Sequence, residues 1–308
     1  MRSSSCPTVI PVCESALALL PESLLVGVSG GVDSVALLQG LLRTGRKPVV
    51  LYFDHGWREE SRAEALWVKE LASRHGLKFV GGKMREGMKQ QVEAEARAAR
   101  YAFFSRTARR LAVPHLVLAH HADDQVETFL LQLLRGSGAA GRGMDPVSER
   151  ESLILHRPWL GIWKREILAY ARKECLEWRE DSTNKDTRYR RNLVRRRVLP
   201  YLQRQFSPQI TENLWRAAEI ARAEGEWLDG LCAEEASRAE LQVQALRTSP
   251  LGQQRRTILR WLQNRGVRDI GFADVEAVRG LVERERPAKI NLSGGRFARR
   301  REGRIFVE

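Results

Sequence analysis

Residues 24–42 read LLVGVSGGVDSVALLQGLL, an apolar stretch that is interrupted by two glycines, an aspartate and a serine before it resumes. The apolar run before Gly30 predicts a buried strand, and the apolar spacing after the interruption predicts a helix over 32–44. A glycine pair costs roughly 0.5–1 kcal/mol per residue relative to alanine in a regular element. We therefore expect the turn between strand and helix to require backbone positions without a side chain.

This turn has the features of a phosphate site. Backbone N–H groups converge where the strand ends, and the positive end of the helix dipole favours an anion. Ser29 and Ser34 add hydroxyl donors, and Gly30 and Gly31 leave room for phosphate oxygens. Asp33 is suited to a Mg²⁺ ion that bridges phosphates. The alternative is an ordinary helix cap; the string matches neither GxxxxGK[ST] nor GxGxxG.

Short apolar runs alternate with amphipathic stretches through the first half of the chain. The predicted strands are 23–29, 48–55, 77–82, 115–121 and, more weakly, 152–158, and the predicted helices are 32–44, 60–75, 90–112 and 123–135. This alternation predicts an α/β fold with a doubly wound parallel sheet. Functional residues are then expected at the carboxyl ends of the strands.

The sheet pattern stops at about residue 158. A long helical stretch follows over 209–238, and the remainder contains two helical patterns and a basic hairpin pattern. We therefore expect three parts: an α/β domain over 1–208, a helical linker over 209–238 and a small α+β domain over 239–308.

The charge balance is strongly basic. Among 308 residues, Lys and Arg number 52 and Asp and Glu 38, which gives a net charge of +14. Such a surface attracts polyanions, and nucleic acid is the first candidate. No segment approaches the roughly 18 uninterrupted apolar residues of a membrane span, so we expect a cytoplasmic protein with no membrane contact.

The four cysteines form no CxxC pair and no zinc-site spacing. We expect them to be reduced and unpaired. The sequence does not decide the oligomeric state, and a homodimer stays open.

A second polar cluster lies in LAHHADDQVETFLLQLLRGSG, residues 118–138. Asp124 and Glu127 are three residues apart, so they share one face of the predicted helix near its first turn. Acidic residues are also favoured there by the helix dipole alone, and capping is the alternative explanation.

Together these motifs resemble the PP-loop ATP pyrophosphatases, whose signature is SGGxDS, and among them the tRNA(Ile)-lysidine synthetases. HHADDQVET followed by RGSG is similar to the lysidine synthetase signature, and EAEARAARYAFF (93–104) to its ExxARxxRY segment. EDSTNKDTRYRRN (180–192) resembles EDxSNxxxxYxRN with Thr183 in place of Ser, and FDHGWREES (53–61) resembles DHxLR with Trp57 in place of Leu. The resemblance covers about residues 24–202.

The resemblance implies an ATP-dependent ligase. It would join free L-lysine to C2 of the wobble cytidine in the isoleucine tRNA with a CAU anticodon, through an O-adenylyl intermediate, with release of AMP and pyrophosphate. The expected ATP-binding residues are Ser29, Gly30, Gly31, Val32, Asp33 and Ser34, with Asp33 also holding Mg²⁺.

The chemistry assigns expected roles to four further residues. The lysine ε-amine has a pKa of about 10.4 in water, so it needs an anionic site and a proton acceptor. We expect Asp124 and Glu127 to grip this amine and His120 to assist proton transfer or to orient it. Arg100 is expected to stabilise negative charge on the transferring α-phosphate.

Six arginines lie between residues 188 and 197. A charged run is most often a solvated face, but here it follows the expected active-site half. We expect contacts with the tRNA backbone from Arg188, Arg190, Arg191, Asn192 and Arg195. A second candidate for tRNA contact is the C-terminal hairpin with Arg296, Arg299, Arg300, Arg301 and Arg304.

Three other functions remain as alternatives. An amide-forming PP-loop enzyme would turn over ATP without RNA, although no glutaminase motif is present. A tRNA thiolase is disfavoured because no cysteine lies near the second motif. A non-catalytic RNA-binding protein would bind tRNA without releasing pyrophosphate.

Overall fold

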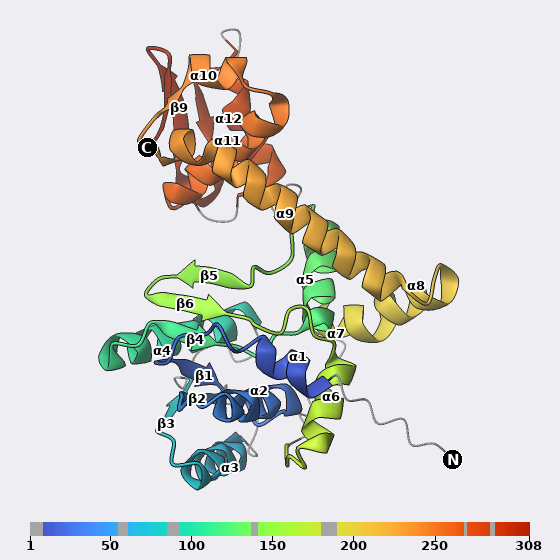
Figure 1. The fold of residues 1–308 in the computed structure, drawn as a ribbon. Helices are drawn as coiled ribbons and strands as arrows, with labels where there is room; N and C mark the ends of the chain where they lie inside the picture. Colours follow the sequence, from blue (N-terminus) through green and yellow to red (C-terminus); the bar gives the residue numbers. More distant parts are fainter. Residues whose placement is uncertain are drawn as a thin grey trace. The chain divides into compact units, whose positions relative to one another are not determined.

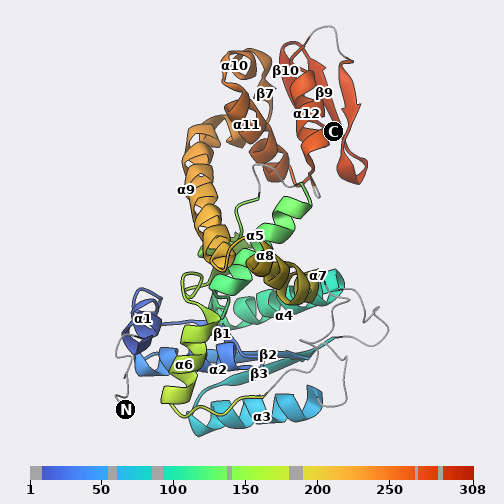
Figure 2. The ribbon, with the colours of Figure 1, turned by 90° about the vertical axis from the view of Figure 1, so that its right-hand side faces the viewer.

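A computed structural model provides the fold and describes residues 9–54, 61–84, 93–136, 141–179, 190–267, 270–283 and 287–308. Six strands of the N-terminal half form one sheet in the order β3-β2-β1-β4-β6-β5 (Figures 1 and 2). They are β1 (Leu25–Gly27), β2 (Val49–Asp54), β3 (Phe79–Lys83), β4 (His115–Val117), β5 (Val147–Arg150) and β6 (Leu153–His156). All neighbouring strands are parallel except β5, which is antiparallel to β6. The predicted α/β class is confirmed.

Helices cover both faces of this sheet, with α2 and α3 on one face and α4 on the other (Figure 2). The helices of this half are α1 (Val9–Ser15), α2 (Val32–Arg43), α3 (Ser61–Arg74), α4 (Glu93–Leu111), α5 (Ala122–Leu134) and α6 (Lys164–Lys173). Along β1, Val26 packs into the core cluster of α2, α3 and α6, whereas Leu25 packs into the cluster that contains Phe104 of α4. This alternation gives each face of the sheet its own core.

The sheet order places two predicted motifs beside each other. β1 pairs with β2 on one side and with β4 on the other, both in parallel. The carboxyl ends of β1 and β4 therefore lie at the same edge of the sheet, at the point where the strand order reverses. The glycine turn follows β1 there, and the polar cluster at 118–127 follows β4.

Several elements were not predicted from the sequence. They include α1, the edge strand β5, and in the C-terminal part β7 (Leu241–Gln242) and α10 (Val243–Thr248). β5 has the sequence VSER and alternates between exposed and half-buried side chains, so it has no apolar run to indicate a strand.

The C-terminal part contains a four-stranded antiparallel sheet with the order β7-β10-β9-β8. Along the chain, the elements between α6 and β7 are α7 (Arg190–Leu193), a π-helix (Val194–Val198), α8 (Leu199–Gln205) and α9 (Ile210–Ser237). The later elements are α11 (Leu251–Asn264), α12 (Phe272–Gly280), β8 (Lys289–Asn291), β9 (Phe297–Arg301) and β10 (Arg304–Val307). Trp261, Ile258 and Ile305 are fully buried in the core of this part. The predicted C-terminal hairpin is confirmed as antiparallel pairing, but its residues form three strands, β8, β9 and β10, instead of two.

The described residues divide into two compact units. One contains Met1–Glu127 and Met144–Thr211, and the other contains Thr128–Gly143 and Glu212–Glu308. The three-part division at 208 and 238 stays a prediction. Within the described ranges no helix is long and apolar enough to cross a membrane. Cys13, Cys175 and Cys232 are free, as expected, and Cys6 lies outside these ranges.

Candidate active site

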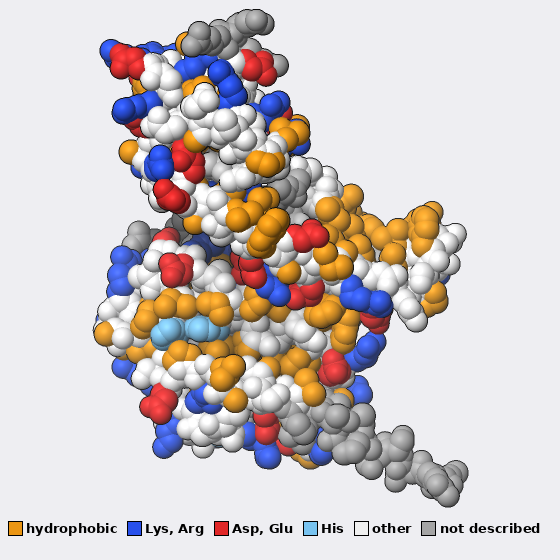
Figure 3. All heavy atoms as spheres, turned by 45° about the horizontal axis from the view of Figure 1, so that its top comes forward, with side chains coloured by type: hydrophobic (Ala, Val, Ile, Leu, Met, Phe, Trp, Pro, Cys, Tyr) orange, Lys and Arg blue, Asp and Glu red, His pale blue; other side chains and the backbone are white. Residues whose placement is uncertain are grey.

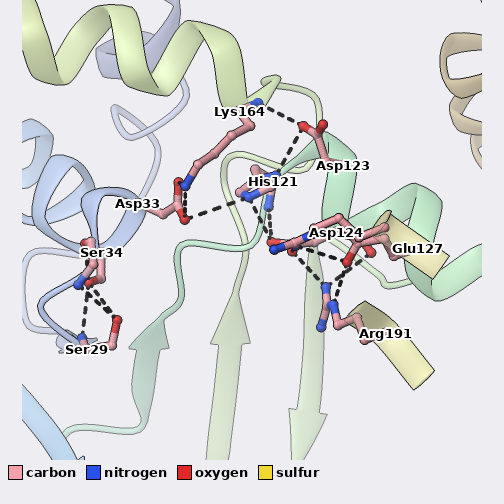
Figure 4. A network of polar contacts seen from close by, with 11 residues as sticks. Ser29, Asp33, Ser34, His121, Asp123, Asp124, Glu127, Lys164 and Arg191 are labelled. Carbon is pink, nitrogen blue, oxygen red and sulfur yellow. Dashed lines mark hydrogen bonds and ion pairs between the residues drawn. The ribbon is translucent and has the colours of Figure 1, made fainter. Parts of the chain in front are cut away.

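The glycine turn is held in shape by its own serines (Figure 4). Gly30 has a φ of 90°, in the left-handed region that favours glycine. The Ser34 hydroxyl donates to the carbonyl of Gly31 at 2.9 Å and accepts from the backbone N–H of Ser29 at 3.1 Å. The carbonyl of Gly30 accepts from the N–H of Arg179 at 2.9 Å. Hydrogen bonds within the protein therefore hold the loop in this shape.

Asp33 points away from these serines toward two cationic groups (Figure 4). Nζ of Lys164 lies 2.5 Å from Oδ1 and 2.6 Å from Oδ2 of Asp33. Nε2 of His121 lies 3.8 Å from Oδ2 of the same carboxylate. The backbone N–H of Lys164 in turn donates to Oδ2 of Asp123 at 2.9 Å. The start of α6 is thus tied to both the glycine turn and the first turn of α5.

The acids of α5 form a second centre, which is joined to the first through His121. The backbone N–H of His121 donates to Oδ2 of Asp124 at 3.1 Å. Arg191 donates from Nε to Glu127 at 2.7 Å and from an Nη atom to Asp124 at 2.8 Å. Arg195 donates from Nε to Glu127 at 2.5 Å. Glu127 is only 1 % exposed, so two guanidinium groups balance a buried carboxylate.

The charge states of this centre follow from burial and from these pairs. Burial acts to raise the pKa of Asp124, but Arg191 and the neighbouring histidines outweigh it and hold that pKa well below its usual range. Burial acts to lower the pKa of His121, but the carboxylates of Asp123, Asp124 and Asp33 around the ring raise it overall. The carboxylates around His121 therefore favour the protonated, cationic form of its ring.

His120 is the opposite case. Burial lowers its pKa to about 3, so the ring is neutral at physiological pH. Its Nδ1 is buried and has no hydrogen-bond partner among the described residues. A ring with so low a pKa is a weak base, which makes an orienting role for His120 better supported than proton transfer.

Arg100 lies on α4 with its Nε buried and unpartnered among the described residues. Burial lowers its pKa, although its guanidinium lies over the ring of Tyr101 at 5.6 Å. The charge of Arg191 contributes to the same lowering. A guanidinium whose Nε is buried and unpartnered among the described residues is suited to an incoming anion.

The residues predicted to contact tRNA are separated by the structure into two groups. Arg191 and Arg195 face the acids, whereas Arg190 is exposed and Asn192 is half-buried. Arg188 lies outside the described residues. The π-helix over Val194–Val198 contains Arg195, and such helices are frequent at functional sites.

The arginines of the C-terminal hairpin all contact protein groups. Arg296 and Arg300 donate to the carbonyls of Arg265 and Leu281. The remaining three form surface ion pairs, which are Arg299–Glu308, Arg301–Glu302 and Arg304–Glu240. Exposed pairs of this kind are weak, so these side chains can still exchange partners. On the face in Figure 3, Lys and Arg side chains are scattered among acidic ones and form no single stripe.

Sequence reasoning missed Lys164 and gave no role to His121 and Asp123. The sequence does carry one signal for Lys164, because it is a cation at the first residue of α6. The positive end of a helix disfavours such a residue. His121 and Asp123 were part of the quoted motif, but only the fold shows that they bridge the two centres.

The carboxylate of Asp33 fits a Mg²⁺ ion that is bound mainly through substrate phosphates. A carboxylate is a hard oxygen ligand of the kind that Mg²⁺ prefers, whereas Ser29 and Ser34 lie on the other side of the turn and would face the phosphates. The Lys164 ammonium now stands where a cation would pair with Asp33. Among the described residues no group of three or more His, Cys, Asp or Glu side chains is arranged to hold a metal by itself.

Family models match both halves of the chain. A PP-loop domain model matches residues 14–202, and a model of the TilS substrate binding domain matches residues 241–306. A tRNA(Ile)-lysidine synthase of Thermus thermophilus is 37 % identical over 96 % of this chain and 58 % of that protein. The enzyme of the same name from Gloeobacter violaceus is 37 % identical over 87 % of this chain and 85 % of that protein.

The lengths of these relatives differ, and the chain spans little more than half of the Thermus protein. Among solved structures, a U34-tRNA thiolase from Methanococcus maripaludis is similar with a TM-score of 0.56. It is 13 % identical, and the match covers 68 % of this chain and 76 % of that one. At this identity the likeness concerns the fold alone.

Proposed function

The chain belongs to the tRNA(Ile)-lysidine synthase family of PP-loop proteins, and from this membership we propose that it attaches L-lysine to the wobble cytidine of an isoleucine tRNA. The observation that carries the proposal is the continuous polar network of Figure 4. It begins at Asp33, the aspartate of the SGGVDS motif, and continues through His121 to Asp124 and, by way of Arg191, to Glu127. This network supports the proposal because it connects the proposed ATP-binding motif with the proposed amine site.

In the first step the cytidine O2 attacks the α-phosphate of ATP, and pyrophosphate leaves. Ser29, Ser34 and the backbone of Gly30 and Gly31 hold the phosphates at the positive end of α2. A Mg²⁺ ion held by Asp33 supplies charge neutralisation to the phosphates. Arg100 stabilises the α-phosphate, a role supported by its buried Nε, which has no hydrogen-bond partner among the described residues.

In the second step the lysine ε-amine attacks C2 of the cytosine, the bond from C2 to the adenylylated oxygen breaks, and AMP leaves with that oxygen. Asp124 and Glu127 attract the ammonium form and orient it. Arg191 and Arg195 both pair with these acids, and for Asp124 the guanidinium of Arg191 lowers the pKa and favours the carboxylate form. His120 supplies a neutral ring that orients the amine.

The tRNA is held by arginines outside this network. Arg190 is exposed at the start of α7, directly before the arginine that binds the acids. A phosphate contact at Arg190 would place the anticodon loop near the acid centre. An anticodon loop also presents an unstacked cytidine at little cost. Arg188, Asn192 and the C-terminal hairpin are further proposed contacts.

The test is the incorporation of labelled lysine into an isoleucine tRNA transcript with a CAU anticodon, with ATP and Mg²⁺ present. A methionine tRNA with the same anticodon is the control. We expect lysine to be retained only on the isoleucine tRNA, with AMP and pyrophosphate released. Pyrophosphate release without lysine retention would indicate another adenylating PP-loop enzyme. Binding of tRNA without either product would indicate the non-catalytic alternative.

Asp124→Asn supplies the matched variant for this test. Its amide keeps the size of the side chain but removes the charge that attracts the ammonium. We expect pyrophosphate exchange to persist while lysine transfer falls by at least about a hundredfold. Lysine transfer at the wild-type rate would remove Asp124 from the amine site.

A further inference from the structure

We propose that Lys164 is a phosphate-binding residue that moves from Asp33 to the ATP phosphates when the metal-bound nucleotide arrives. This inference rests on the proposed ATP binding by the glycine turn. It assigns a residue of α6, distant in the sequence, to the phosphate site of α2.

Lys164 and Asp33 are in direct contact. Nζ of Lys164 lies within 2.6 Å of both carboxylate oxygens of Asp33, at a sequence separation of 131 residues. The two side chains are 33 % and 28 % exposed, so the pair lies at an opening and not in the core. A partly exposed ion pair contributes little to stability, which leaves the pair free to exchange partners.

Lys164 is the first residue of α6. The N-terminus of a helix carries a partial positive charge, so a lysine there is disfavoured unless an anion compensates. Asp33 and Asp123 now provide that compensation, the first to the ammonium and the second to the backbone N–H. A phosphate group at this place would satisfy the same two donors more strongly.

The sequence of the glycine turn provides no cationic side chain of its own. Residues 29–34 read SGGVDS and contain no cation. Other phosphate loops carry a lysine that reaches the β- and γ-phosphates. Here the nearest cation to the loop's aspartate in the described residues comes from α6, and the fold delivers it through the contact with Asp33.

A consequence concerns the metal. While Lys164 occupies both oxygens of Asp33, that carboxylate has its charge neutralised and cannot serve as a metal ligand. Lys164 and the metal therefore compete for Asp33 in the free protein. In the nucleotide complex they cooperate, because the displaced ammonium then pairs with phosphate oxygens. Removal of Lys164 should weaken nucleotide binding. At the same time it should lower the Mg²⁺ concentration at which the metal half-saturates its site.

The experiment measures binding of α,β-methylene-ATP, which cannot release pyrophosphate, by titration calorimetry over a range of Mg²⁺ concentrations. The variants are Lys164→Met and Lys164→Arg, with Lys173→Met as the control because Lys173 is an exposed lysine of the same helix. At saturating Mg²⁺ we expect Lys164→Met to bind about tenfold more weakly. We expect its half-saturating Mg²⁺ concentration to fall at least about threefold. Lys164→Arg should recover part of the affinity.

Each outcome decides a separate point. If the wild-type protein binds the analogue and Lys164→Met binds it equally well, with the same Mg²⁺ midpoint, the lysine proposal is wrong and the ATP site stands. If the wild-type protein does not bind the analogue, the proposed function itself fails. Far-UV circular dichroism checks that each variant is folded. Should Lys164→Met not fold, Lys164→Gln takes its place, and an unchanged affinity and midpoint in that variant would overturn the proposal equally.

Discussion

Nε of Arg191 lies 2.7 Å from Oε2 of Glu127, a carboxylate that the structure buries almost completely. A buried acid of this kind depends on its partners, because the loss of one leaves charge without compensation. Arg195 is the second partner of the same carboxylate. The acid centre therefore joins α5, α7 and the π-helix and contributes to stability, in addition to its proposed role as a site for the substrate amine.

Replacement of Arg191 tests this dependence. We expect Arg191→Met to lower the free energy of unfolding by about 2 kcal/mol, less than a fully broken buried pair because Arg195 still binds Glu127. Urea denaturation at pH 7 measures the change. Arg190→Met is the matched control, since its side chain is exposed, and it should change stability by less than about 0.5 kcal/mol. Equal effects of the two variants would contradict the network.

The two glycines of the turn should respond differently to alanine. Gly30 has a φ of 90°, so a Cβ atom there strains the backbone, although the surrounding space would accept it at 3.6 Å from Val68. We expect Gly30→Ala to cost about 1–3 kcal/mol in urea denaturation. Gly31 has a φ of −72° and its Cβ would meet only the Ser29 hydroxyl at 3.5 Å. Gly31→Ala should therefore leave the stability of the free protein unchanged, and a similar loss in both variants would contradict this account.

The buried His120 ring predicts a loss of stability in acid. The unfolded chain binds a proton at this ring near pH 6.5, whereas the folded protein does so only near pH 3. The contribution is therefore present above pH 6.5 and is lost as the pH falls toward 3, by about 1.4 kcal/mol per pH unit. Between pH 6.5 and 5 we expect the free energy of unfolding to fall by about 2 kcal/mol less in His120→Asn than in the wild-type protein.

This pH dependence is measured by urea denaturation at several pH values between 5 and 7.5. His75→Asn is the control, since His75 is exposed at the end of α3. The same acid slope in wild-type protein and in His120→Asn would show that His120 is not the group responsible.

The exposed arginine of α7 should act on tRNA binding and not on chemistry. We expect Arg190→Gln to weaken tRNA binding and to reduce the slope of log affinity against log salt concentration by roughly 0.7–0.9, the share of one phosphate contact. Filter binding between 50 and 200 mM salt measures it. Arg110→Gln on the exposed end of α4 is the control. An unchanged salt slope in Arg190→Gln would remove this residue from the interface.

Much of the α/β unit could be predicted because its signals are local. β1, β2, β4 and their helices follow from apolar runs that alternate with amphipathic stretches. β5 could not be predicted, since an antiparallel edge strand with the sequence VSER needs no buried face. Its pairing with β6 depends on the fold and not on its own residues.

The site was predictable to the level of motifs and no further. The glycine turn and the acids Asp124 and Glu127 were identified, but Lys164 was not, because its partner is 131 residues away in the sequence. The role of Arg191 was also incomplete. A basic run suggests tRNA contact, and only the fold shows that one arginine of the run faces inward to Glu127 while its neighbour is exposed.

The sequence separation between Asp33 and Lys164 also means that the two residues are synthesised at different times. A chain made at about 5–20 residues per second completes its glycine turn on the order of ten seconds before α6 exists. During that interval Asp33 lacks the lysine that neutralises it in the finished fold. The nascent chain thus carries the phosphate loop without its cation. Full affinity for nucleotide should therefore appear only after α6 has emerged from the ribosome and docked.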